Sequence, residues 1–143
     1  YGVLGDKKLV YRTEVVKKYP KYPIFAGESF VPLGYLYQLI DQDYELIPLN
    51  KVLCIVEYMQ DGSSATILKQ YRKNPKGFAF SRKSRMLLAE NLKDKFKNAI
   101  HYVSSSMFIK NKKFIKESPK KLSTILAIPF GIILYVYIKF KTR

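Results

Sequence analysis

The apolar and polar positions of residues 26–40 predict a short helix that buries one face. Apolar side chains recur at the i, i+3, i+4 and i+7 positions of a helix, which are Leu33, Leu36, Tyr37 and Ile40. Ser29 is a favourable N-cap residue, and Pro32 is tolerated in a first helical turn. Gly27 supplies a turn with positive φ just before them. We therefore expect Glu28 to lie at the N-terminal end of this helix.

Residues 44–49 and 52–58 predict two β-strands. Asn50 and Lys51 separate them, which suits a two-residue hairpin turn. The second strand begins with five consecutive apolar residues, so we expect both of its faces to be buried. Cys54 in this run is expected to be a small core residue. As the single cysteine it allows no disulfide within the chain, which fits a reducing compartment.

From residue 65 onward the chain predicts helices. The first is expected to stop at residues 74–77, where the sequence reads NPKG. A second helix is expected over residues 78–92 and a third over residues 94–108, with an apolar face and lysines elsewhere. His101 lies off that apolar face and has no second ligand at metal-binding spacing. We interpret it as a surface or helix-packing residue.

Residues 122–138 are an uncharged, mainly apolar run between two groups of lysines. These seventeen residues would extend roughly 25 Å as a helix, which is short of a hydrocarbon core of about 30 Å. Pro129 and Gly131 predict a kink, and Tyr135 and Tyr137 suit a membrane interface. We expect a hydrophobic C-terminal helix that lies in, or dips into, an anionic leaflet. A buried core helix is the alternative.

The composition allows a folded core, and the charge distribution narrows the choice of partner. Of the 143 residues, 48% are hydrophobic, and the net charge is +15. Residues 1–65 hold seven basic and eight acidic side chains, whereas residues 66–143 hold nineteen and three. Such a one-sided excess of positive charge is typical of proteins that bind a polyanionic surface. Nucleic acid and an anionic membrane both fit.

Two groups of carboxylates are candidates for chemistry. Glu28 lies between Phe25 and Phe30, and a carboxylate in a water-poor setting can act as a general base. The simpler interpretation is a helix-start carboxylate that the helix dipole favours. Asp41 and Asp43 form a D-x-D triplet that could hold Mg²⁺ or Mn²⁺. Because they end a helix without a glycine-rich loop nearby, we interpret them as a solvated turn.

Five short segments occur in an order that resembles family 2 glycosyltransferases. They are YRT (11–13), GESFVP (27–32), NKVLCIVEY (50–58), DGSS (61–64) and NPKG (74–77). A bacterial subgroup of that family has similar GE-x-F-x-P, EY-x-x-DG-x-S and NPKG steps. Each segment is only a few residues long, but their order and spacing cover nearly the whole chain.

The resemblance implies a GT-A fold, in which an α/β nucleotide-binding half precedes an acceptor-binding half and a helical tail. This chain is similar to the later parts. We therefore expect an α/β fold (α+β within this fragment): a partial GT-A-like domain with a short β-hairpin, then helices and a hydrophobic C-terminal helix. Residues 1–65 would be the acceptor-side part, residues 66–121 a basic helical region and residues 122–143 a membrane-associating tail. The D-x-D that binds the divalent metal (Mg²⁺ or Mn²⁺) and the sugar diphosphate belongs to the preceding half. No metal or cofactor ligands are thus expected here.

The resemblance also implies roles for particular residues. Glu28 aligns with the acidic position of the acceptor-side motif, where a carboxylate deprotonates the acceptor hydroxyl in an inverting transfer. Many relatives have an acidic pair at that point, and Ser29 takes its second position here. Asp61, Gly62 and Ser64 are similar to the flexible loop that closes over substrate.

The function implied is that of a glycosyltransferase in cell-surface polysaccharide synthesis. Its partners would be a nucleotide-sugar donor, a glycan or lipid-linked acceptor and an anionic membrane surface. The expected location is the cytoplasmic face of the bacterial inner membrane, held peripherally or by a single C-terminal anchor. One alternative is a non-catalytic basic protein that binds membrane surfaces. The other is a nucleic-acid-binding module, against which stand the uncharged run at 122–138 and the lack of a recognisable motif.

Overall fold

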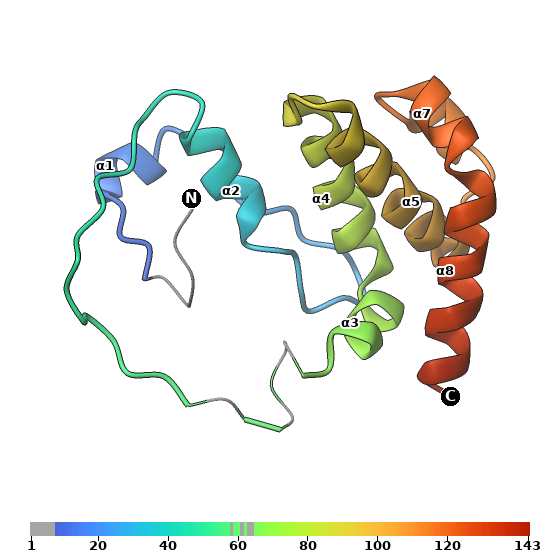
Figure 1. The fold of residues 1–143 in the computed structure, drawn as a ribbon, viewed down its shortest axis with the longest axis horizontal. Coiled ribbons are helices and arrows are strands. Elements are labelled where there is room, and N and C mark those ends of the chain that lie inside the picture. The colour runs from blue at the N-terminus through green and yellow to red at the C-terminus, as the bar shows by residue number, and fades with distance from the viewer. Residues whose placement is uncertain (1–7, 58, 61, 63–64) are drawn as a thin grey trace.

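Helices of the C-terminal part of the chain pack side by side, and the N-terminal part extends away from them in long loops (Figure 1). The computed structural model describes residues 8–57, 59–60, 62 and 65–143. Two helices belong to the N-terminal part: α1 (Thr13–Val16) and α2 (Gly34–Ile40). The others are α3 (Ile67–Lys73), α4 (Pro75–Leu88), α5 (Leu92–Ile109), α6 (Phe114–Glu117), α7 (Lys121–Leu126) and α8 (Ile128–Lys141).

The boundaries of α4 and α5 follow from local chemistry. Pro75 occupies the first turn of α4, where its missing N–H costs no helical hydrogen bond. Asn91 is the N-cap of α5, since its side chain accepts a 2.8 Å hydrogen bond from the backbone N–H of Asp94. Lys110 then takes a left-handed conformation (φ 58°) and ends that helix. The NPKG segment (74–77) was expected to end a helix, and it lies where α3 ends and α4 begins.

The hydrophobic core lies where α4 and α8 pack against α5. It is formed by buried side chains of α4, α5 and the α7–α8 junction: Ala79, Met86, Ala99, Tyr102, Val103 and Ala127. The hydroxyl of Tyr102 donates a 2.9 Å hydrogen bond to the carbonyl of Phe114, which ties α5 to α6. Gly131 of α8 lies directly against Val103 and Ile100. Because of this close approach, one side of α8 belongs to the core.

The predicted α/β fold is wrong, and so is the partial GT-A-like domain with its β-hairpin. The described residues contain helices and no strand, and residues 45–57 form the wide loop at the left of Figure 1. Ile47, Val52 and Ile55 are about 90% exposed (90%, 88% and 93%). Cys54 is also exposed, not buried in a core as expected. An isolated two-stranded hairpin is marginal in water without a third strand or a helix on its apolar face, and among the described residues neither covers this loop.

The C-terminal apolar run forms two helices instead of the one expected. α7 ends at Leu126, and α8 begins with Pro129 in its first turn. Nowhere in the described chain is a helix both long and apolar enough to cross a membrane, so a single C-terminal anchor is not supported. One side of α8 buries Gly131 and Ile138, as in the core-helix alternative, while its other side stays exposed.

The helix expected after Ser29 begins later than its N-cap pattern suggested. α2 starts at Gly34, and Leu36 and Ile40 are buried as expected. Ser29 is not its cap, because the N-cap position is Leu33 and no side chain caps this helix. The backbone N–H of Ser29 donates instead to Oδ1 of Asn74. The residues around Glu28 are thus bound to the start of α4, which decides the geometry of the candidate site.

Candidate functional site

The carboxylate of Glu28 binds the N-terminal end of α4. Its Oε1 accepts a hydrogen bond from the backbone N–H of Lys76 and its Oε2 one from the backbone N–H of Gly77, both at 2.8 Å. These N–H groups lie in the first turn of the helix, where they have no partner inside it. A negative charge at this end is also favoured by the helix dipole. Glu28 therefore lies at a helix N-terminus, as predicted, but at that of α4 and not of α2.

A second set of hydrogen bonds holds the same two segments together. Asn74 is 1% exposed, and its Oδ1 accepts from the backbone N–H of Ser29 at 2.9 Å. Its Nδ2 donates to Oε1 of Gln70, also at 2.9 Å. The ammonium of Lys76 donates to the carbonyl of Ala26 at 3.2 Å. The GESF and NPKG segments, which are distant in sequence, thus form one unit.

Gly77 permits this close contact. A Cβ atom at that position would collide with the carbonyl oxygen of Phe30, so a larger residue would push the 28–31 segment away from α4. Aromatic rings pack beside the contact: Phe30 lies 5.6 Å from Phe78 between ring centroids, and Tyr35 lies 4.7 Å from Phe80. The carboxylate of Glu28 is therefore held at the edge of an aromatic cluster on α4.

The Glu28 carboxylate can accept further hydrogen bonds in this arrangement. A carboxylate oxygen can accept more than one hydrogen bond, so each oxygen retains an acceptor site beyond the one that a backbone N–H occupies. A hydroxyl group bound beside it could hydrogen-bond to the carboxylate and transfer its proton. The same contacts also suit a structural carboxylate at a helix start, the simpler interpretation from the sequence.

The expected substrate loop is only partly within the described chain. Asp61 and Ser64 lie outside the described residues. The backbone N–H of Gly62 donates to the carbonyl of Met59 at 3.0 Å. Its own carbonyl accepts from the N–H and the hydroxyl of Thr66, each at 3.0 Å. Gly62 is therefore part of the turn that leads into α3.

Residues 41–43 form a turn, as interpreted from the sequence, but only Asp43 is exposed as a solvated turn requires, and Asp41 is partly buried. Asp41 follows the last residue of α2, and Asp43 accepts a 2.6 Å hydrogen bond from the hydroxyl of Tyr19. This bond raises the pKa of Tyr19 to about 12, because it holds the phenol proton between two oxygens. Within the described ranges, no three His, Cys, Asp or Glu side chains come close enough to hold a metal ion.

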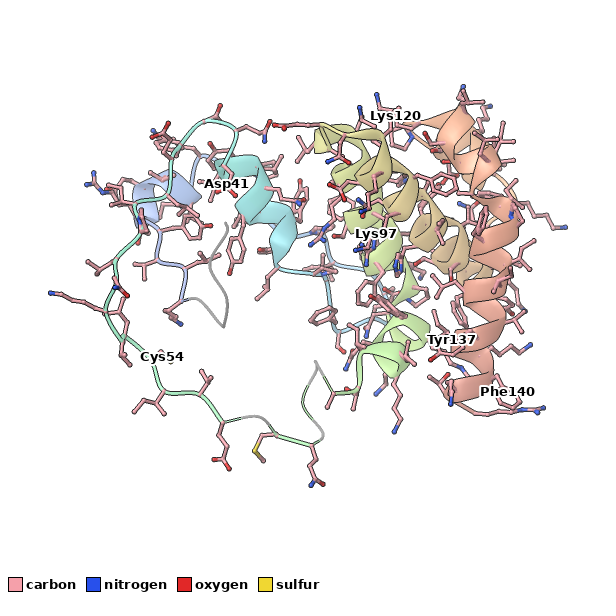
Figure 2. All side chains as sticks on the ribbon, in the orientation of Figure 1. Asp41, Cys54, Lys97, Lys120, Tyr137 and Phe140 are labelled. Atoms are coloured by element: carbon pink, nitrogen blue, oxygen red, sulfur yellow. The ribbon has the colours of Figure 1, made fainter. Side chains whose placement is uncertain are left out.

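A cavity that the sequence analysis missed lies between α2 and the α4–α5 pair. Its volume is about 390 Å³, and its charged lining residues are Asp41, Arg82, Arg85, Asp94 and Lys97. Figure 2 labels Asp41 on the α2 side and Lys97 on the α5 side. A signal was present in the sequence, since Arg82 and Arg85 lie three residues apart on one helix face. Their convergence with Lys97 required the packing of α4 on α5.

Positive charge dominates the α4–α5 side of this cavity. Arg82 donates to Oδ1 of Asn98 at 3.0 Å and to the hydroxyl of Tyr71 at 3.4 Å, and burial lowers its pKa. The ring of His101 lies near that of Tyr71, the residue whose hydroxyl Arg82 contacts, with 5.5 Å between the two ring centroids. Burial, followed by the charges of Arg82, Lys97 and Arg85, lowers the pKa of His101 to about 4. His101 is thus a neutral packing residue at neutral pH, in line with its interpretation from the sequence.

Comparisons with protein-family models, with curated proteins and with solved structures gave no match to this chain.

Proposed function

We propose that the chain is the acceptor-side part of a glycosyltransferase similar to family 2, with Glu28 as its general base. The observation that carries the proposal is the binding of Glu28 to Lys76 and Gly77 at the start of α4. This contact joins the GESF and NPKG segments, two of the segments on which the family resemblance rests. The described residues do not have the α/β fold that the resemblance implies, so the proposal rests on this contact and on the order of the segments, not on the fold.

In the proposed reaction, an acceptor hydroxyl transfers its proton to the Glu28 carboxylate while its oxygen attacks the anomeric carbon of a nucleotide sugar. The bond from that carbon to the donor phosphate breaks, and the nucleoside diphosphate leaves with the electron pair. The two backbone N–H groups keep the carboxylate in place as it receives the proton. Donor binding and the divalent metal of the full-length enzyme belong to residues outside this chain.

The proposal is tested by Glu28→Gln in the full-length enzyme that contains this chain. Glutamine keeps the size of the side chain but is not a base, so we expect kcat to fall by about 10²- to 10⁴-fold. Glu45→Gln is the matched control, because Glu45 is exposed in the loop and lies outside the segments of the family resemblance. A Glu28→Gln enzyme that is folded and turns over at the rate of the control would exclude Glu28 as the base.

A second proposed function is binding to an anionic membrane surface, and it stands with or without catalysis. The exposed side of α7 and α8, here called the outer face, presents large apolar side chains: Leu126, Phe130, Ile133, Tyr137 and Phe140. Each is between 48% and 74% exposed. Figure 2 labels Lys120 near the start of α7 and Phe140 near the end of α8. Lysines at both ends would pair with lipid phosphates while the apolar side chains enter the interface. The expected attachment is peripheral, at the cytoplasmic face.

A further inference from the structure

We propose that the cavity between α2 and the α4–α5 pair binds a phosphorylated sugar. Its phosphate would bind Arg85 and Lys97, and its hydroxyl groups would bind Gln38 and Asp41. This inference rests on the proposed function, since it identifies part of the acceptor. Its test is a binding measurement that needs neither the donor nor Glu28.

Arg85 is the main reason to expect an anion. Its Nε is buried and has no hydrogen-bond partner among the described residues. Its guanidinium lies over Gly34, where a Cβ atom would come within 2.6 Å of Nη2. A buried donor without a partner costs free energy, and a phosphate oxygen would satisfy it. Arg82, held by Asn98 and Tyr71, adds a second positive charge beside it.

The α2 side of the cavity has the opposite character. Oε1 of Gln38 is buried and has no donor within the described chain. The carboxylate of Asp41 lies on the same side, and its two oxygens together can accept several hydrogen bonds. Amide and carboxylate oxygens of this kind accept hydrogen bonds from hydroxyl groups, which sugars carry. The cavity thus places phosphate-binding and hydroxyl-binding groups on facing walls.

The charges and volume favour a sugar phosphate over a larger anion or a neutral sugar. Three cations face two carboxylates in the cavity, and one of these, Asp94, accepts a 2.8 Å hydrogen bond from Nδ2 of Asn91. The remaining positive charge suits one phosphate group. A cavity of about 390 Å³ lies at the small end of ligand sites, which suits a monosaccharide with one phosphate.

The position relative to Glu28 also fits an acceptor. Both sites lie on α4, and Arg85 is eight residues beyond Gly77, or about 12 Å along the helix axis. An acceptor with its phosphate in the cavity could therefore present to Glu28 a hydroxyl group of its next sugar unit. A soluble sugar phosphate and a lipid-linked one share this chemistry.

The experiment is isothermal titration of the full chain with glucose 1-phosphate, inorganic phosphate and glucose at one ionic strength. We expect glucose 1-phosphate to bind at least tenfold more tightly than either other probe. Arg85→Gln should weaken its binding by about ten- to a hundredfold, the effect expected of a lost charge-assisted hydrogen bond. Lys112→Gln is the control, because Lys112 is exposed and lies in the link between α5 and α6.

Gly34→Ala keeps every charge and displaces only the Arg85 guanidinium, so it tests the geometry if Arg85→Gln unfolds the chain. It should also weaken binding. The proposal would be overturned if inorganic phosphate bound as tightly as glucose 1-phosphate, if glucose 1-phosphate did not bind, or if Arg85→Gln and Lys112→Gln bound it with equal affinity.

An octyl ester of glucose 1-phosphate distinguishes a lipid-linked ligand from a soluble one. Tighter binding of the ester than of the free compound indicates a lipid-linked ligand, and equal or weaker binding indicates a soluble one. Glu28→Gln should bind normally, which separates this result from a failure of the proposed base.

Discussion

Glu28 shows how a single residue can be found from sequence while its setting is not. The glycine before it and the aromatic residues around it marked it as a carboxylate at a helix start. Two helices were available, however, and the carboxylate binds α4, the one that begins with the NPKG segment. The choice depends on the contact of Gly77 with the Phe30 carbonyl, which joins residues far apart in the chain. No local pattern carries that information.

His101 provides a prediction at the same scale. Its pKa is about 4 in the folded chain, compared with 6.5 for an unperturbed histidine. The unfolded state therefore binds a proton more readily, so the stabilising contribution is complete above pH 6.5 and declines as the pH falls toward 4. We expect the chain to lose up to about 3 kcal/mol of unfolding free energy over this range, at about 1.4 kcal/mol per pKa unit. Urea unfolding between pH 7.5 and pH 4.5 measures it.

His101→Gln is the control for this pH dependence. It removes the titrating group, so the variant should keep only the smaller loss that carboxylate protonation causes at the acidic end. Equal pH dependence in the two proteins would show that burial and the charges of Arg82, Lys97 and Arg85 do not hold His101 neutral.

At the scale of elements, local patterns predicted helices better than strands. Most helices after residue 65 were expected, because a helix satisfies its backbone hydrogen bonds within one segment. The apolar run at 52–58 suggested a strand, but a strand needs a neighbour for its backbone groups and a layer for its side chains. In the described residues neither is present, and Val52 and Ile55 point into solvent. The same run of residues is therefore compatible with a loop.

Gly131 gives a prediction about the contact between α8 and α5. Gly131→Leu places a side chain where a Cβ atom alone would lie 2.5 Å from Val103. We expect a net loss of roughly 1–3 kcal/mol, despite the higher helix propensity of leucine, because overpacking forces the helices apart. Chemical denaturation measures the change. Ile133→Leu, an exposed position of the same helix, should have little effect, and a Gly131→Leu chain as stable as this control would contradict the close packing.

At the scale of the whole molecule, we expect the positive charge and the apolar outer face of α7 and α8 to contribute together to membrane binding. Replacing both Ile133 and Phe140 with serine removes two exposed apolar side chains but no charge. We expect binding to vesicles that contain phosphatidylglycerol to weaken by about tenfold or more, since each buried apolar side chain contributes of the order of 1 kcal/mol. Vesicle co-sedimentation measures this, with phosphatidylcholine vesicles as the uncharged comparison.

Val52 and Ile55 offer the matched control, because they are apolar and exposed but lie in the loop. Replacing both with serine should leave vesicle binding unchanged. If the two double variants bound vesicles equally, the outer face would not be the membrane-binding surface. Tight, salt-sensitive binding to duplex DNA that neither variant alters would instead favour the nucleic-acid alternative.

The sequence alone determined the properties that depend on composition and local pattern. These are the basic C-terminal half, most of the later helices and the candidate carboxylate of Glu28. Each follows from charges or from spacings of a few residues, which act before the chain has a shape. The tertiary structure decided which helix receives Glu28, that Arg85 meets Lys97 in a cavity, and that the 52–58 run has no partner strand. Those outcomes depend on which distant segments pack together, and packing is a property of the whole chain.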